Sequence, residues 1–291
     1  MNKKTLLILA FVFILLAVIL VIVRTAGRNE RSESHINTQD IHKIVVKAGG
    51  ADESTELEKK DDGWYVGKWP ADNKASKNII TALGDLQLED IISTRKEKYG
   101  DFEVDEESAT VVTAETDSGN SIKIYVGKRS AEWTRNFVRI EGDPAVYLTR
   151  SISRQMADRE WRSRNIISDP DNGTVEETEI EYKDRKFSLD KSTQAGENIR
   201  DNMRRLTASG FVDEPGKDIE EHFNDAFMKI KLKYRSGPDA VFTALKIDDK
   251  AYLKAENTGL IYEIREDALD KLTEAIENNK EHPLEKKDPP K

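Results

Sequence analysis

The sequence predicts an α+β protein in which an N-terminal transmembrane helix precedes two related, mainly antiparallel β-sheet units, each with amphipathic helices. Three observations predict this class. One apolar run is long enough to cross a bilayer, short stretches of alternating apolar and polar residues lie between turn residues, and two such stretches resemble each other. With 37% hydrophobic and 7% aromatic residues, the 291-residue chain can build packed cores, which excludes a wholly disordered protein.

Charge and cysteine content exclude several functional classes. The chain has 55 acidic and 46 basic residues, a net charge of −9, which argues against a nucleic-acid partner because such binding depends on neutralising phosphates. It has no cysteine, which excludes a disulfide framework, a zinc–thiolate site and a thiol nucleophile. No motif predicts a cofactor.

The first element is the predicted membrane anchor. Residues 5–23 read TLLILAFVFILLAVILVIV, a helix of ~28 Å against a hydrocarbon core of ~30 Å. A cleaved signal peptide is the alternative, but its apolar region is shorter and ends in small residues, whereas Arg24 follows directly here. We therefore expect an uncleaved, single-pass anchor over residues 1–28, which contacts the membrane through residues 5–23.

Orientation is harder to predict, because Lys3 and Lys4 precede the run while Arg24, Arg28 and Arg31 follow it. A short tail before a first helix usually stays in the cytoplasm, so we expect the bulk of the chain to be extracytoplasmic. Acidic units are repelled by an anionic bilayer. Residues 29–38 are accordingly expected to act as a polar tether.

An internal repeat predicts the two units. Residues 136–150 (NFVRIEGDPAVYLTR) align without gaps with residues 251–265 (AYLKAENTGLIYEIR). Each stretch predicts a hairpin, with the turn types that Gly142–Pro144 and Asn257–Gly259 favour. A helix is expected after each hairpin. The pattern is clear in the second unit, where Ala268, Leu269, Leu272, Ala275 and Ile276 share one face.

The likeness continues upstream with gaps. Strands are predicted around Ile41–Val46 and around Ile180–Tyr182, and an amphipathic helix follows in each half. The first helix is lined by Ile79, Ile80, Leu83 and Leu86, with Asn73 as its expected cap; the second is lined by Ile199, Met203 and Leu206. Hairpins are then expected over residues 110–126 and 227–247. Each unit is therefore predicted to run strands, helix, four strands, helix.

These patterns predict the domain boundaries. The first α+β unit is expected over residues 39–168 and the second over residues 174–280, with a turn-rich junction between them. Residues 281–291, rich in proline and charge, are expected to form a flexible tail. Asp169, Asp171 and Gly173 within the junction resemble the start of a calcium loop, but its twelfth position is Ile180, so a plain turn is favoured.

No catalytic motif is present, so we expect a protein that is not an enzyme. A phosphate-binding loop, a dinucleotide fingerprint, a nucleophile elbow and a His-Glu-x-x-His motif are all missing from the sequence. Its four histidines, including His222 in the pair Glu221-His222, are expected to have surface or structural roles. A hydrolase of unrecognised geometry remains the third alternative.

A run of arginines is the predicted interaction surface. It consists of Arg150, Arg154, Arg159, Trp161, Arg162 and Arg164, a set able to bind phosphate or glycan groups. Asp158 and Glu160 interrupt it, so a solvated helical face with internal ion pairs is the alternative. Trp64, Tyr65 and Trp69 could likewise form a ligand platform or pack on their own hairpin.

The order of short motifs along the chain resembles the bacterial domain of unknown function 4340 family. The matching pieces are Asp40-Ile41 with Ile44, Leu57-Glu58-Lys59, Gly63–Val66, Ala71-Asp72, Tyr99-Gly100, Val126-Gly127, Phe137-Val138-Arg139, Val146-Tyr147 and Trp161–Arg164. The resemblance implies a membrane anchor and often two copies of the domain, and it carries over no catalytic residue. It also implies an accessory role beside ABC-type transporter subunits.

Together these observations predict a non-enzymatic, membrane-anchored, extracytoplasmic interaction protein. Its expected partners are the membrane and the permease and ATPase subunits of an ABC-type complex. The alternative is an extracytoplasmic binding protein for an envelope glycan or lipid, which would use the arginine run or a groove between the repeats.

Overall fold

The computed structural model describes residues 37–167, 174–183 and 185–278. The chain divides into two compact units, the first ending at Arg162 and the second beginning at Ser163. The division thus precedes the predicted junction, which lies outside the described residues, as do the anchor, most of the tether and the tail. Over the described ranges, no helix has the length and apolar character needed to span a membrane.

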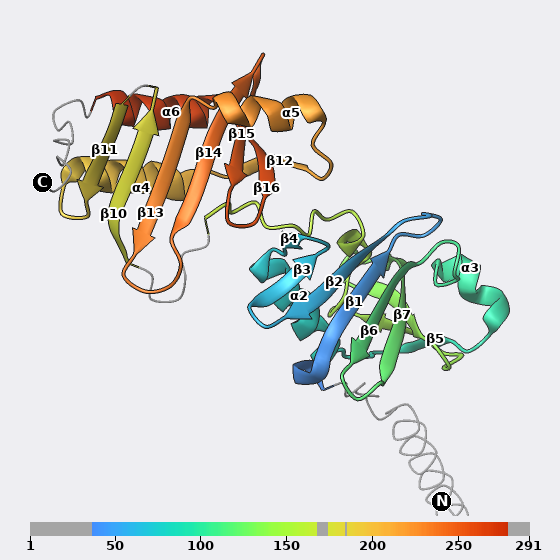
Figure 1. The fold of residues 1–291 in the computed structure, drawn as a ribbon. Coiled ribbons are helices and arrows are strands. Elements are labelled where there is room, and N and C mark those ends of the chain that lie inside the picture. The colour runs from blue at the N-terminus through green and yellow to red at the C-terminus, as the bar shows by residue number, and fades with distance from the viewer. Residues whose placement is uncertain (1–36, 168–173, 184, 279–291) are drawn as a thin grey trace, which may run out of the picture. The chain divides into compact units, whose positions relative to one another are not determined.

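The first unit is built on a nine-stranded antiparallel sheet in the order β4-β3-β2-β1-β6-β7-β8-β9-β5 (Figure 1). Its strands are β1 (Ile41–Lys47), β2 (Ser54–Lys60), β3 (Gly63–Val66), β4 (Trp69–Pro70), β5 (Ile91–Ser93), β6 (Thr110–Thr116), β7 (Ser121–Arg129), β8 (Asn136–Ile140) and β9 (Val146–Thr149). Every pairing is antiparallel, because hairpins make most of the connections.

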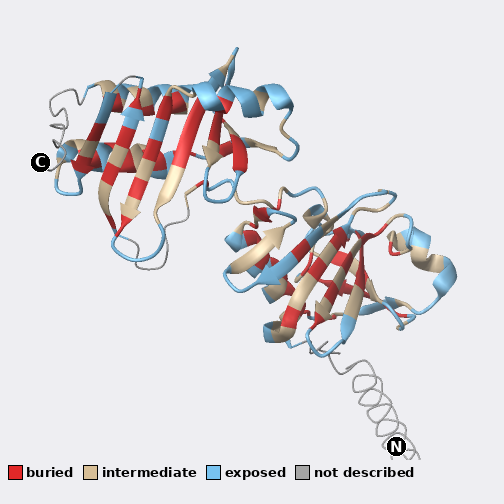
Figure 2. Cartoon of the chain, viewed as in Figure 1, coloured by how far each residue is buried: buried red, intermediate tan, exposed pale blue. Residues whose placement is uncertain are grey.

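Helix α2 (Asn73–Gly84) covers one face of this sheet. Its apolar side, including Ile79 and Leu83, is fully buried against strand residues such as Ile44 (Figure 2). The cap differs from the prediction by one position: the Asp72 carboxylate accepts the amide of Ala75 (2.6 Å), while Asn73 is the first helical residue. Asp72 satisfies an otherwise unpaired amide of the first turn.

The opposite face carries a second, smaller core under the segment that holds η2 (Lys96–Lys98) and α3 (Tyr99–Phe102). Val104, Tyr125 and Val146 are buried there, and Phe102 packs against Phe137 with ring centroids 4.8 Å apart. The segment passes so close to β7 that a Cβ on Gly127 would lie 2.2 Å from the Phe102 carbonyl oxygen. Glycine is therefore required at this position.

The predicted closing helix of the first unit is wrong. After β9 the chain forms only the short η3 (Arg154–Met156) and then an irregular stretch. This stretch buries Ile152 and Trp161 in the main core beside α2. The Ser153 side chain accepts the amide of Gln155 and caps the start of η3, which ends after one turn.

The second unit is a seven-stranded antiparallel sheet in the order β11-β10-β13-β14-β15-β16-β12. Its elements are β10 (Val175–Tyr182), β11 (Arg185–Asp190), α4 (Gln194–Arg205), β12 (Ala208–Val212), α5 (Lys217–His222), η4 (Phe223–Asp225), β13 (Met228–Tyr234), β14 (Ala240–Ile247), β15 (Lys250–Ala255), β16 (Leu260–Ile264) and α6 (Glu266–Glu277). Helices α4 and α6 pack together on one face (Figure 1). On the other face Phe223 joins a small core with Leu245 and Tyr252.

Apart from β3 and β4, which have no counterpart in the second unit, the two sheets share one topology. In each, the strand after the first helix (β5 or β12) runs to the far edge and pairs with the last strand (β9 or β16). The final hairpins have the same register, since Asn136 faces Thr149 and the aligned Ala251 faces Ile264. The bulge of β1 after Ile41 matches that of β10 after Val175. These edge strands were not predicted, so each unit has five strands after its first helix.

Candidate functional site

The predicted arginine surface does not include an exposed aromatic ring. Trp161 is 2% exposed and belongs to the main core of the first unit. Its Nε1 donates to the carbonyl of Met156 (3.2 Å), and its own carbonyl accepts the amide of Asp72 (2.7 Å). The Arg159 guanidinium lies 5.7 Å from its ring centroid. Trp161 therefore packs the core and offers no free face to a ligand.

Three of the predicted arginines are paired with carboxylates. Arg150 contacts Glu89 (2.8 Å), and Arg154 contacts Glu103. Arg162 donates to both carboxylate oxygens of Glu160, through Nε (2.9 Å) and Nη2 (2.8 Å). Arg164 instead donates to the carbonyl of Ala208 (3.2 Å) in the second unit. These partners neutralise most of the positive charge on which an anion-binding surface would depend.

The hairpin aromatics pack on their own sheet. Trp69 is 2% exposed, and the Tyr65 hydroxyl donates to Asp62 (2.7 Å) while Lys60 lies over the ring of Tyr65 (4.3 Å). Each aromatic side chain of this hairpin is at least half-buried. The arrangement matches a hairpin cluster better than a ligand platform.

The described histidines do not converge on a site. The His42 Nδ1 lies 3.3 Å from a carboxylate oxygen of Asp117, and the His222 Nδ1 lies 2.5 Å from the Asp218 carbonyl oxygen within α5. His35, His282 and the calcium-like sequence at 169–173 lie outside the described residues. Among the residues that are described, no group of three His, Asp or Glu side chains could hold a metal.

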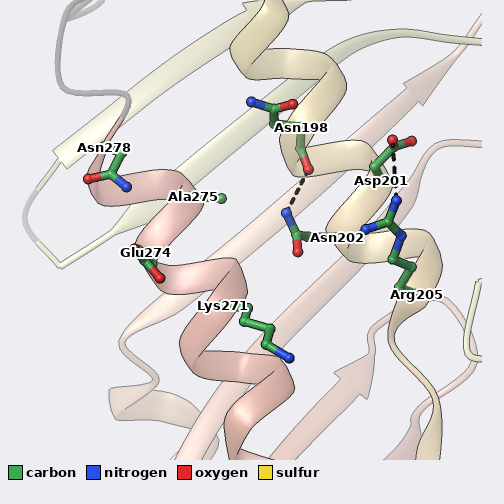
Figure 3. Close-up of a pocket in the computed structure, with 8 residues that line it drawn as sticks. All are labelled: Asn198, Asp201, Asn202, Arg205, Lys271, Glu274, Ala275 and Asn278. Carbon is green, nitrogen blue, oxygen red and sulfur yellow. Dashed lines mark hydrogen bonds and ion pairs between the residues drawn. The ribbon is translucent and has the colours of Figure 1, made fainter.

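A shallow groove of about 360 Å³ lies between α4 and α6 of the second unit (Figure 3). Its lining is Asn198, Asp201, Asn202, Arg205, Lys271, Glu274, Ala275 and Asn278. Two acids and two bases balance one another, and the Asn202 amide is already bound to the Asn198 carbonyl (2.8 Å). Ligand sites are usually lined by apolar residues with a few converging polar groups. This groove has one apolar residue and balanced charges, so it does not resemble such a site.

A different feature stands out on the first unit. Within the described ranges, the exposed large hydrophobic side chains are Ile91 (39%) and Ile92 (39%) in β5 and Trp133 (74%) in the loop between β7 and β8 of the same sheet. We call these three residues the β5 edge patch. Single exposed apolar residues are common, whereas exposed apolar residues on segments that contact each other are typical of an interaction surface.

Ion pairs of Arg135 connect the loop that contains Trp133 to the residues just before β5. The Arg135 guanidinium contacts Glu132 (2.9 Å), next to Trp133, as well as Glu89 (3.2 Å) and Asp90 (3.3 Å), next to Ile91. Because Glu89 above all accepts its hydrogen bond, the pKa of Arg135 is raised above its ordinary value. The side chain is 16% exposed, so this ion network is partly shielded from water.

Trp133 occupies an uncommon backbone conformation. Its φ is 60°, in the left-handed region that bulky residues avoid. The loop of residues 130–135 is closed by hydrogen bonds from the amide of Ser130 to the Arg135 carbonyl (2.8 Å) and from the Trp133 amide to the Ser130 carbonyl (2.9 Å). The equivalent turn in the second unit, between β14 and β15, has two residues. The indole thus projects from an enlarged loop that the second unit lacks.

The sequence analysis missed this patch. The adjacent pair Ile91-Ile92 follows two acids, and Trp133 lies among polar residues, so neither fits a core pattern. Apolar residues that fit no core pattern were the feature of the sequence from which this surface could have been predicted. Their proximity depends on β5 pairing with β9 and on the contacts of Arg135, which are not visible in the local sequence.

The fold is that of a protein with two α+β units of one topology. The family model named Domain of unknown function (DUF4340) matches residues 64–232, from β3 of the first unit to β13 of the second. This is more than half of the chain, and the chain therefore belongs to the DUF4340 family. Neither the curated proteins nor the solved structures gave a match.

Proposed function

We propose that the chain is a non-enzymatic interaction protein that is anchored in a membrane through residues 5–23 and exposes both units on the extracytoplasmic side. It works as an accessory component of an ABC-type transport complex. The β5 edge patch is the surface by which it contacts its protein partner.

The concentration of exposed apolar side chains in the β5 edge patch carries this proposal. Tryptophan is enriched among the residues that dominate binding energy at protein interfaces, and isoleucine supplies apolar area around it. Trp133 has a φ of 60°, a backbone conformation that is unfavourable for a bulky residue. Contact of the indole with water does not compensate for this energetic cost. A partner that covers the indole offsets this cost.

The link to a transporter rests on the family resemblance and on the apolar run at residues 5–23. The glycan or lipid alternative relied mainly on the arginine run. It has less support, because Trp161 is buried and Arg150, Arg154 and Arg162 are paired with glutamates.

Recovery of the tagged full-length chain from membranes in mild detergent, followed by mass spectrometry, tests the proposal. We expect permease and ATPase subunits to co-purify with the wild-type chain. The double substitution Ile92→Thr with Trp133→Ser should reduce their recovery more than about tenfold, as loss of a dominant interface residue does.

Lys186→Ala is the matched control, since it changes an exposed side chain on an edge strand of the other unit. It should leave recovery unchanged, and a chain lacking residues 1–28 should show whether the anchor is needed. Recovery of the wild-type chain without protein partners, or equal recovery with the double variant, contradicts the proposal.

A further inference from the structure

We propose that Arg135 is a positioning residue for the partner contact. Its ion pairs fix the loop of residues 130–135 against the residues that precede β5, so that Trp133 and the two isoleucines form one surface. The inference rests on the proposed function and specifies which side chain, itself largely shielded from solvent, makes that surface ready for binding.

The loop of residues 130–135 is fixed at its two ends but not at its tip. Ser130 is buried, and the Asn136 side chain, directly after the loop, donates to the carbonyl of Ile152 (3.0 Å). Residues 131–134 are all exposed, so none of them packs into a core. The Trp133 amide donates to the Ser130 carbonyl (2.9 Å), which lies within the loop itself. A contact from outside the loop is therefore needed to fix the position of the indole.

Arg135 provides this contact through the two ends of its guanidinium. Nη1 contacts Glu89 (3.2 Å) and Asp90 (3.3 Å), which precede β5. Nη2 contacts Glu132 (2.9 Å), the residue before Trp133. Because the guanidinium is planar and its donors have fixed directions, these contacts set an orientation as well as a distance.

The acids that precede β5 are themselves fixed, because their backbone is paired with β9. The Glu89 amide donates to the Leu148 carbonyl (2.8 Å), and the Leu148 amide donates to the Asp90 carbonyl (3.2 Å). Arg135 thus connects the loop to a hydrogen-bonded part of the sheet. Fixing a binding loop in advance raises affinity, because less conformational entropy is lost when the partner binds.

The burial of Arg135 indicates that its role is geometric more than stabilising. The side chain is 16% exposed, and its Nε is buried without a hydrogen-bond partner among the described residues. An unpaired, buried N–H costs free energy, and a shielded ion pair is weak evidence for stability. An arginine present despite this cost is consistent with the use of shielded ionic groups to specify one conformation.

Over its described residues, the second unit has neither this loop nor this network. Its equivalent edge strand, β12, is preceded by the uncharged Leu206 and Thr207, whereas two acids precede β5. Lys250, which aligns with Arg135, pairs instead with Glu263 of the last strand (3.2 Å). The network thus accompanies the exposed tryptophan, as expected if its role is to position that side chain.

Hydrogen–deuterium exchange of the full-length chain in detergent tests the positioning role without a partner. The Ser130 and Trp133 amides are hydrogen-bonded inside the loop, so their exchange reports how often the loop opens. With Arg135→Ala, peptides covering residues 130–135 should exchange at least about tenfold faster than in wild type. Arg135→Lys should give an intermediate rate, because an ammonium is a point charge that does not bridge both sides in a fixed orientation.

Lys123→Ala is the matched control. Lys123 lies in β7 of the same sheet and pairs with two acids, Glu106 (3.7 Å) and Glu141 (3.1 Å). It is roughly 20 Å along the strand from the loop. The control therefore removes a comparable set of ion pairs and should leave exchange over residues 130–135 unchanged.

Partner recovery separates positioning from general stability. Arg135→Ala should lower the recovery of permease and ATPase subunits several-fold, because apparent affinity falls with the fraction of molecules whose loop is correctly placed. In a Trp133→Ala background the same substitution should cause no further loss, since a residue that acts through Trp133 has no role once the indole is absent.

Two outcomes overturn the inference: equal loop exchange in Arg135→Ala and wild type, and an equal further loss of recovery in the Trp133→Ala background. Neither outcome contradicts the proposed function. That function is contradicted if the wild-type chain recovers no transporter subunits, or if recovery does not depend on Ile92 and Trp133. The exchange measurement needs no partner, so the two failures are distinguishable.

Discussion

Two tryptophans of the first unit show how burial assigns different roles to the same residue type. Trp161 is 2% exposed in the main core, while Trp133 is 74% exposed at the sheet edge. Burial of an indole contributes several kcal/mol to folding, and an exposed indole contributes little. Trp133 therefore serves something other than stability.

The substitution Trp133→Ala should leave the free energy of unfolding within about 1 kcal/mol of wild type, whereas Trp161→Ala should lower it by about 3–5 kcal/mol. Urea denaturation followed by circular dichroism measures both. A loss above about 2 kcal/mol for Trp133→Ala would show that the indole packs on the unit and is not available to a partner.

A second residue-scale prediction concerns pH. Burial, and then the hydrogen bond to Asp143 (2.7 Å), raises the pKa of Tyr147 to about 12. The folded state thus favours the neutral phenol. Its contribution, about 3 kcal/mol, is complete below the unfolded pKa of about 10 and is lost as the pH rises through 12.

The variant Tyr147→Phe isolates this effect. Between pH 9 and pH 12 the wild type should lose more stability than the variant, as measured by urea midpoints at each pH. Parallel curves for the two proteins would show that Tyr147 is not protected from ionisation.

At the scale of elements, the sequence predicted best where local pattern and turn chemistry agree. The hairpins β8–β9 and β15–β16 were aligned correctly because alternation and turn residues fix their register. β5 was missed because Ile91–Ser93 is too short to show a period. The closing helix was wrong because the burial of Ile152 and Trp161 decides the path of that segment.

The close approach of the α3 segment to β7 gives an element-scale prediction. Gly127→Ala places a Cβ 2.2 Å from the Phe102 carbonyl, so the α3 segment must move and the free energy of unfolding should fall by at least about 2 kcal/mol. Gly100→Ala is the control, because its nearest contact is 4.0 Å away. Equal stability of the two variants would contradict this packing.

At the scale of the whole molecule, each unit has the parts of an independent domain. The second unit places α4 and α6 on one face of its sheet and the Phe223 core on the other. Its buried residues include Ile199, Leu269 and Leu272, all within the same unit. A unit of this size can bury a sufficient core alone.

We therefore expect residues 163–291 to fold when expressed separately. The fragment should show a cooperative urea transition, and Leu272→Ala within it should lower the free energy of unfolding by about 2–5 kcal/mol. A gradual, non-cooperative change would show that the second unit depends on the first.

The two-residue turn between β14 and β15 has a consequence for protein engineering. Asp248 adopts a φ of 51° and lies in the turn that joins β14 to β15, which pair in one continuous register, whereas the pairing of β7 with β8 shifts between Val126 and Arg129 beside the longer loop. Loops of either length are thus compatible with one scaffold. Transplanting residues 130–135 into that turn would give the second unit an exposed tryptophan loop. The reverse exchange would remove Trp133 from the first unit and would have to remove the register shift between Val126 and Arg129 as well.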